Sequence, residues 1–516
     1  MSIAPPRGIV SPPQSGVPLR RVLLLCVPAL MLGAILRIAF LETTPEIFYG
    51  ADSNSYFEAA LKLWNEGQIK FNDKRRYLYP AMLVFAPLLP GSTAVGVAVI
   101  QHILGLLIIV GIAWIVAQMT RFPDIWVPLA TCLAAVWPRM FWYEHEMIAE
   151  VWILAAFVTA VALAVPCGAL KDKQRLFWFL VALVAIVALK PHGRGLWLGL
   201  MLVAVAMAGN PLRWGVKNLT LVGIAALVML TTGSGQQGSW LLLNSTLPLV
   251  QIEGEPYAKY RAILQPFIEE ARADLGNYAH RQTIYKKGLN GSQPMFGDEW
   301  KALTEDRALY TKVANRLAAE AILAHPLAYA QLVARKIARA SIIHIPGRIA
   351  PAKFWSDQEA MNTKRIQRDP NEIELLYGID VEAYRRLVEE RRQRTTWLAP
   401  LMTRLSHVLY WVDYRPGPPG TAAHINPTVL GWLLALGLVA SLSPRHFACR
   451  ALLLLPVAFY LFTTFGVGDS VSRYLHPIDW AGIVLIAIGL DTLVGLVADV
   501  AARLRRRFGV VPAAAP

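Results

Sequence analysis

The chain is poor in charge and in cysteine. Only 16% of its 516 residues are Asp, Glu, Lys or Arg, whereas 55% are hydrophobic, a balance that does not suit a water-soluble globule. The four cysteines are scattered and show no CxxC spacing, which excludes a disulfide scaffold and predicts free, buried thiols. The sequence also lacks GxxxxGK[ST], a strand-linked GxGxxG and HExxH, so no soluble nucleotide-binding domain is indicated.

Long apolar runs recur along the chain instead. A helix satisfies its own backbone hydrogen bonds and can therefore cross the hydrocarbon core of a bilayer. Because the apolar runs are numerous, we expect an all-α polytopic membrane protein of about ten transmembrane helices. The run Tyr77–Leu89 is short and broken by prolines, and we interpret it as re-entrant. The predicted spans are Val22–Leu41, Ser92–Met119, Ile125–Trp142, Met147–Val165, Leu176–Leu189, Leu196–Met207, Leu219–Leu230, Val429–Leu442, Ala451–Phe465 and Ile478–Val497.

Lys and Arg at the ends of these runs set the orientation. The net charge of +15 could mark a nucleic-acid binder, but its distribution indicates topology signals and attraction for anionic lipid. With the N-terminus in the cytoplasm, the short inside loops carry the basic residues. The expected parts are a disordered tail (1–19), an N-terminal transmembrane module (20–232) with an outward first loop (42–76), a mainly helical extracytoplasmic domain (233–426), C-terminal transmembrane helices (427–502) and a basic cytoplasmic tail (503–516).

The first outward loop contains "GADSNSYFEAALKLW", from Gly50 to Trp64. Asp52 stands at the head of a half-apolar helix, whose apolar side would pin it to the membrane interface. Asp caps helices well, so Asp52 could serve only as an N-cap. The alternative is a carboxylate that faces a polar cavity.

Other ionisable residues gather where predicted spans reach the outside. Carboxylates and cations at one membrane boundary suit a reaction that deprotonates one group and releases a phosphate. Each has a structural alternative: Lys190 could snorkel to the interface, Arg473 could be an interfacial anchor, and Glu144 and Glu146 could be solvated. Glu150 starts a span and should face a polar cavity or a partner. The set is Lys74, Arg75, Arg76, Arg139, Glu144, His145, Glu146, Glu150, Lys190, His192, Arg194, Asp469, Arg473, Tyr474 and His476.

Four stretches in this order resemble the GT-C class of integral-membrane glycosyltransferases, and most closely the group with protein O-mannosyltransferases and bacterial lipid A glycosyltransferases. The first, "ADSNSYFEAALKLWNEG", is similar to that class's first-loop motif of an Asp followed by a Tyr and a small-residue helix. "RRYLYPAMLVF" with "VAVIQHILGLLIIVGIAWIVA" resembles its Tyr-Pro segment and Gln-containing span. "WPRMFWYEHEMIAEVW" resembles the Pro-to-Glu segment, with Glu150 at the acidic position, and "SRYLHPI" the late Arg-Tyr-Pro element.

The resemblance implies an enzyme that moves a hexose or pentose from a polyprenyl-phosphate donor to an acceptor hydroxyl. It implies a bacterial cytoplasmic-membrane protein whose active site faces the periplasm, and an acceptor in the envelope (lipid A, protein or polysaccharide). Asp52 would be the general base, and Glu150 would orient its helix or the acceptor. The donor phosphate would contact Arg473, Lys190, Arg194, Arg75 and Arg76, and the substrates would contact Tyr56, Glu146, His145, Tyr474 and His476.

Ser53 stands where many relatives have a second acidic residue, so the resemblance implies no metal ligands, and a requirement for a divalent metal stays open. Two other functions also stay open. One is a transporter or flippase of a lipid-linked saccharide, although the sequence shows no internal repeat of the kind typical of transporters. The other is a glycan ligase or polymerase.

Overall fold

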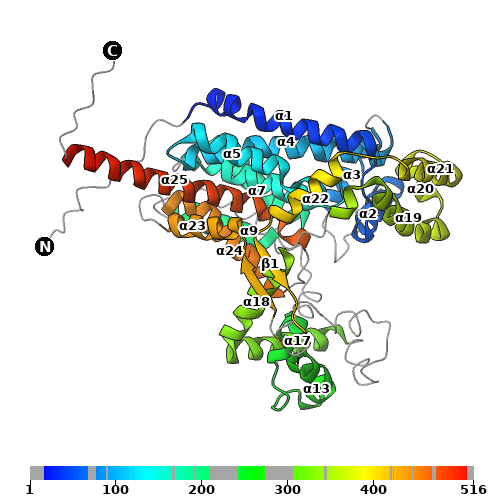
Figure 1. Ribbon diagram of the computed structural model, residues 1–516. Coiled ribbons are helices and arrows are strands. Elements are labelled where there is room, and N and C mark those ends of the chain that lie inside the picture. The colour runs from blue at the N-terminus through cyan, green and yellow to red at the C-terminus, as the bar shows by residue number, and fades with distance from the viewer. Residues whose placement is uncertain are drawn as a thin grey trace.

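The computed structural model describes residues 17–67, 77–88, 91–165, 169–190, 193–207, 242–273, 306–341, 346–418, 421, 423–442, 447–467 and 472–507. Within these ranges the chain is almost entirely helical (Figure 1). The exception is one antiparallel pair of short strands, β1 (Val412–Arg415) and β2 (His424–Pro427). The all-α prediction therefore agrees with the described part of the chain.

Four described helices are long and apolar enough to cross a membrane: α1 (Leu19–Thr43), α4 (Thr93–Met119), α24 (Phe447–Val467) and α25 (His476–Arg507). A fifth span results if α17 (Arg307–Ala324) and α18 (Pro326–Ala340), which are bent by 105° at their junction, are counted as one. The chain is an integral membrane protein.

Shorter helices coincide with most of the other predicted spans. They are too short to meet the same length criterion, and the predicted span Leu219–Leu230 lies outside the described residues, so the count of about ten spans is not confirmed. Of the predicted re-entrant segment Tyr77–Leu89, the described residues 77–88 form only α3 (Leu78–Leu83) and a 3₁₀ turn, η1 (Ala86–Leu88), which are too short to cross. The shorter helices are α5 (Pro123–Val136), α7 (Glu150–Ala164), α8 (Lys173–Leu189), α9 (Gly193–Met207) and α23 (Val429–Ser441).

The predicted span Ile125–Trp142 is two helices. Helix α5 ends at Val136, and α6 (Pro138–Tyr143) begins after one extended residue, Trp137, with ψ of 114°. A residue that precedes proline is disfavoured in the helical region because the proline ring clashes with it. Pro138 therefore ends the first helix and redirects the chain toward the segment that carries Glu144 and Glu146.

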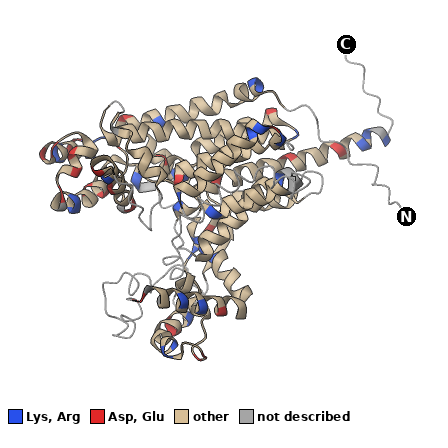
Figure 2. Cartoon of the chain, turned by 180° about the vertical axis from the view of Figure 1, so that it is seen from behind, with Lys and Arg blue, Asp and Glu red and all other residues tan. Residues whose placement is uncertain are grey.

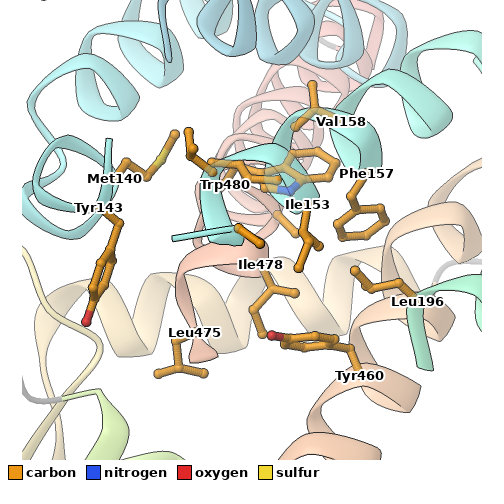
Figure 3. Packing of buried hydrophobic residues seen from close by; sticks show 14 of the residues in the cluster. Met140, Tyr143, Ile153, Phe157, Val158, Leu196, Tyr460, Leu475, Ile478 and Trp480 are labelled. Atoms are coloured by element: carbon orange, nitrogen blue, oxygen red, sulfur yellow. The ribbon is translucent and has the colours of Figure 1, made fainter. Parts of the chain in front are cut away.

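The long helices form one bundle. In one group α1, α4, α5 and α7 lie side by side (Figure 1). In the other, α9 packs on α24 and α23 packs on α25, and α25 also contacts α5 and α7 of the first group. A Cβ atom at Gly437 of α23 would lie 2.0 Å from the carbonyl oxygen of Leu485, so glycine allows the close approach of α23 and α25. Figure 3 shows the core between the groups, where Trp480 meets the ring of Phe157 at 5.0 Å between centroids.

The remaining helices lie at two edges of this bundle. Helix α2 (Ala51–Glu66) lies beside α19 to α21 at one end, and α13 lies with α17 in a separate lobe (Figure 1). Charged residues are frequent in both places and sparse along most of the length of the long helices (Figure 2). The other elements are η2 (Ala169–Lys171), η3 (Leu247–Leu249), α13 (Ala258–Ala273), η4 (Pro346–Ile349), α19 (Pro351–Arg368), α20 (Asn371–Tyr377), α21 (Val381–Arg392), α22 (Leu398–Val408) and η5 (Ser472–Tyr474).

Candidate functional site

Asp52 lies in the first turn of α2, and it is not the residue that caps this helix. Gly50 occupies the N-cap position in an extended conformation, and its N–H donates to the Oγ of Ser53 at 3.0 Å. The helix dipole favours a carboxylate in the first turn. The Oδ2 of Asp52 forms an ion pair with Nη1 of Arg473, so the side chain faces another part of the molecule.

Arg473 lies in η5, directly before α25, and joins two carboxylates. Besides its pair with Asp52, its Nε lies 3.6 Å from Oε1 of Glu150. Its guanidinium lies 5.3 Å from the centre of the Tyr474 ring. Burial acts to lower the pKa of Arg473, but Tyr474, Glu150 and Asp52 outweigh burial and raise the pKa well above its ordinary value. Arg473 is therefore a permanent cation at the centre of the group.

Glu150 and Lys190 form the second ion pair. Glu150 opens α7 and is 1% exposed, and Lys190 follows α8 and is 5% exposed. The Lys190 Nζ contacts Oε1 of Glu150 and lies 5.0 Å from the centre of the Tyr474 ring. The Lys190 side chain is therefore buried against Glu150 and does not extend to the protein surface. Among the described residues, Oε2 of Glu150 is buried without a hydrogen-bond partner.

Glu146 is a further buried carboxylate near Arg473 and Glu150. It is 8% exposed, it accepts a hydrogen bond from Nε1 of Trp142 at 3.3 Å, and a Cβ at Gly50 would lie 3.2 Å from its Oε1. Burial raises the pKa of Glu146 to about 7 against the opposing effect of Arg473. The sequence-based alternative that Glu144 and Glu146 are solvated is wrong, because both are buried.

A short parallel bridge holds Glu146 beside the first loop. The Phe48 N–H donates to the His145 carbonyl at 2.8 Å, and the Met147 N–H donates to the Phe48 carbonyl at 2.9 Å. The side chain of Gln101 in α4 donates to the Glu146 carbonyl at 2.9 Å and accepts from the Tyr79 hydroxyl at 3.0 Å. Segments that the sequence analysis treated as separate motifs thus meet at one place.

The other predicted site residues lie in different surroundings. Tyr56 is buried, with its ring edge-on to Tyr79 at 5.1 Å. His476 is fully buried, its ring lies 5.3 Å from that of Tyr143, and neither ring nitrogen has a hydrogen-bond partner among the described residues. Arg194 lies in the first turn of α9. His145 belongs to a separate buried network, described below, and Arg75 and Arg76 lie outside the described residues.

Two residues of α19 that contact the segment before α2 were not predicted from the sequence. Gln358 accepts the Tyr49 N–H at 2.8 Å through its Oε1, although the two residues are 309 positions apart. Arg365 stacks over the Tyr49 ring at 3.6 Å and donates to Oδ1 of Asn54 at 3.1 Å. No motif surrounds these side chains, so only the tertiary contact reveals them.

The described side chains suggest no metal centre, since no group of three His, Cys, Asp or Glu among them could hold an ion. Four side chains instead form a row in which carboxylates and cations alternate: Asp52, Arg473, Glu150 and Lys190. We call these four residues the charge cluster. Its two carboxylates and two cations balance, so an incoming anion must compete with a carboxylate for a cation.

No protein-family model and no curated protein matches this sequence. Among solved structures, the chain is similar to ArnT from Cupriavidus metallidurans, whose crystal structure was determined bound to undecaprenyl phosphate. The identity is 13%, the match covers 92% of this chain and 78% of the ArnT chain, and the TM-score is 0.29. A likeness of this size carries no argument about function.

Proposed function

We propose that the protein is a glycosyltransferase that moves a sugar from a polyprenyl-phosphate donor to an acceptor hydroxyl at the outer face of a bacterial cytoplasmic membrane. The observation that carries the proposal is the ion pair between Asp52 and Arg473 within the charge cluster. It puts a candidate base beside a candidate phosphate-binding cation, in a membrane protein whose first loop resembles the GT-C motif.

The reaction needs one proton acceptor and one stabilised leaving group. The acceptor oxygen attacks the anomeric carbon while its proton moves to a carboxylate oxygen of Asp52. The bond between that carbon and the phosphate oxygen breaks, and the polyprenyl phosphate leaves with the bonding electrons. Attack from the face opposite the leaving group inverts the anomeric centre. A positioned general base contributes typically ~10²–10⁴-fold to such a step.

Arg473 and Lys190 are the candidate contacts for the departing phosphate. A guanidinium can hold two phosphate oxygens through parallel hydrogen bonds, and its effect on developing charge is larger in a dry site than in water. When the donor phosphate takes Arg473 from Asp52, the carboxylate loses its counter-ion and becomes a better base. The donor would therefore bind before the acceptor is deprotonated. Arg194, Arg75 and Arg76 remain proposed as further phosphate contacts.

The remaining site residues are assigned to positioning and substrate contact. Glu150 would keep Arg473 and Lys190 in place, because its Oε1 faces both cations. Tyr56, Glu146, Tyr474 and His476 would contact the substrates. The Tyr474 ring lies near Lys190 and Arg473, and Glu146 feels the charges of Arg473 and Glu150. Tyr56 follows Asp52 by one helical turn in α2, and His476 follows Arg473 by three residues. The envelope acceptor would enter from the outer face and the donor from the lipid phase.

Asp52→Asn tests the proposal. The amide cannot take the proton, so we expect the turnover of sugar transfer to fall by at least ~10²-fold while the protein still inserts and binds donor. The matched control is Asp124→Asn, which breaks an exposed ion pair with Arg21 and should leave transfer unchanged. Near-normal turnover of the Asp52 variant would remove it as the base.

A second measurement separates transfer from transport and ligation. Mass spectrometry of the lipids that accumulate in a deletion strain should show a monophosphate-linked sugar donor if the protein is a transferase. A diphosphate-linked oligosaccharide would favour the ligase or polymerase. Transbilayer movement of a lipid-linked saccharide without transfer by the purified protein would favour the flippase.

A further inference from the structure

A buried polar network lies next to the charge cluster and includes none of its members. We call it the His102 network, and it consists of Arg37, Glu144, His102 and His145. Arg37 donates to both carboxylate oxygens of Glu144, from Nε at 2.7 Å and from Nη2 at 2.5 Å. The Nδ1 of His102 lies 3.1 Å from Oε2 of Glu144, and its Nε2 lies 2.9 Å from Nδ1 of His145.

The network ends on the backbone of the loop that leads to Asp52. The Nε2 of His145 lies 2.9 Å from the carbonyl oxygen of Glu46. Two residues later, Phe48 forms the bridge to the segment of Glu146, and α2 begins at Ala51. A chain of hydrogen bonds thus runs from α1 and α4 to the loop that sets the position of the Asp52 helix.

The packing leaves the network no freedom to rearrange at low cost. The side chains of Arg37, Glu144 and His102 are at most 3% exposed, and His145 is fully buried. A Cβ atom at Gly105 would lie 2.2 Å from the Glu144 carboxylate, so glycine is needed where Glu144 crosses α4. The rings of Phe40 and Phe354 cover His145 at 4.1 and 5.7 Å between centroids.

The number of protons in the network follows from its geometry. A carbonyl oxygen only accepts, so Nε2 of His145 must carry a proton to bond Glu46. If His145 is neutral, its Nδ1 accepts, and Nε2 of His102 must donate. The contact between Nδ1 of His102 and Glu144 then needs one more proton, on either atom. If His145 is instead the cation, the count is the same. Every fully bonded arrangement holds one proton more than a carboxylate and two neutral imidazoles.

We propose that the His102 network is the positioning element for Asp52 and that it holds the Glu46–Gly50 loop in place only while it contains this extra proton. Loss of the proton leaves two lone pairs facing each other at one of the three contacts, so one link of the chain opens. The loop and the first turn of α2 then lose their anchor on the helix bundle. The inference rests on the proposed function only for the role of Asp52.

The charged surroundings give the direction of the pH dependence. Arg37 of α1 faces Glu144 at one end of the network. Glu46, whose side chain pairs with Arg391 of α21 at 3.1 Å, lies at the other end, beside His145. Burial raises the pKa of Glu144 to about 7 although Arg37 opposes it, and burial lowers the pKa of His145 well below its ordinary value. The extra proton therefore belongs to the Glu144–His102 contact. The folded protein therefore keeps the proton of Glu144 to a higher pH than the unfolded chain does. The network holds the Glu46–Gly50 loop at lower pH and releases it as the pH rises through about 7.

Amide hydrogen exchange of the full-length protein in detergent tests this directly. The Phe48 amide, which donates to the His145 carbonyl, reports on the loop without any transfer assay. After correction for the intrinsic exchange rate, we expect its protection in the unmodified protein to fall about tenfold between roughly pH 6 and pH 8, as expected when one hydrogen bond of about 1.4 kcal/mol is lost. Constant protection over this range would overturn the proton dependence.

The variant His102→Gln should lack the pH dependence and show low Phe48 protection at both pH values. Its control is His407→Gln, an exposed position on α22, which should behave as the unmodified protein does. Full protection of Phe48 in the His102 variant would overturn the positioning role. If that variant does not fold, the pH series of the unmodified protein still tests the proposal, and a failure of the transferase proposal would leave the exchange result intact.

Discussion

Removing the charge of Asp52 should strengthen the binding of the donor phosphate while it abolishes transfer. In the structure, Asp52 neutralises Arg473, the residue that we assign to the phosphate. The phosphate must displace this carboxylate, and the free energy of the Asp52–Arg473 pair opposes binding. Asp52→Asn keeps the shape of the side chain and removes the competing charge.

The magnitude follows from the exposure of the pair. The side chain of Arg473 is 20% exposed and that of Asp52 is 29% exposed, so the pair is neither a surface nor a fully buried ion pair. Exposed pairs contribute about 0–1 kcal/mol, and hydrogen bonds to charged groups contribute about 1.5–3 kcal/mol. We take about 1–2 kcal/mol, which corresponds to a dissociation constant about 5- to 30-fold lower in the variant.

The assay is equilibrium binding of sugar-free polyprenyl phosphate to the purified protein in lipid nanodiscs. Asp124→Asn is again the control, because it changes the same net charge at an exposed pair. Arg473→Ala should weaken binding, and in that background Asp52→Asn should have no further effect, which makes a double-mutant cycle. Weaker or unchanged phosphate binding by the Asp52 variant would refute the competition between Asp52 and the phosphate for Arg473. If Asp52→Asn strengthens binding equally when Arg473 is already Ala, the effect comes from general electrostatics and not from the ion pair.

Two further predictions concern stability. Lys190→Met should lower the free energy of unfolding by about 1.5–3 kcal/mol, because the buried Glu150 loses one charged hydrogen-bond partner and keeps only Arg473, at 3.6 Å. The double variant with Glu150→Gln should regain most of this loss in thermal unfolding of the detergent-solubilised protein, and equal loss in both would contradict the argument. Gly105→Ala should destabilise the protein by about 1–3 kcal/mol, because the added methyl group would overlap the Glu144 carboxylate. The control is Gly495→Ala, whose added methyl group would have its nearest neighbour, Nη1 of Arg121, at 3.5 Å. This variant should be neutral or stabilising in the same measurement.

Several site residues could be recognised before any tertiary contact was known. Asp52 heads an amphipathic helix, Glu150 opens an apolar one, and Lys190 ends another, so each is a charge at the edge of hydrocarbon and needs an explanation. Their partners could not be read in the same way. The pairings of Asp52 with Arg473 and of Glu150 with Lys190 join distant helices, and no local pattern encodes which cation meets which carboxylate.

Neighbouring residues also separate in ways that spacing does not show. His145 and Glu146 are adjacent, yet His145 bonds into the His102 network while Glu146 faces Gly50 and the region of Arg473. The turn after α6 decides this, because it sends successive side chains to opposite sides of one buried segment. Gln358 and Arg365 reach the first loop from α19, which the sequence analysis placed only in a helical outer domain.

The sequence by itself determined that this is a helical membrane protein with a carboxylate at the start of the half-apolar helix after its first apolar run, because apolar periodicity and charge placement are local properties of the chain. The tertiary structure alone decided that Asp52 pairs with Arg473 and that the His102 network reaches the Glu46 carbonyl in the loop before that helix. Those outcomes depend on helix packing, which brings side chains from distant segments within hydrogen-bonding distance.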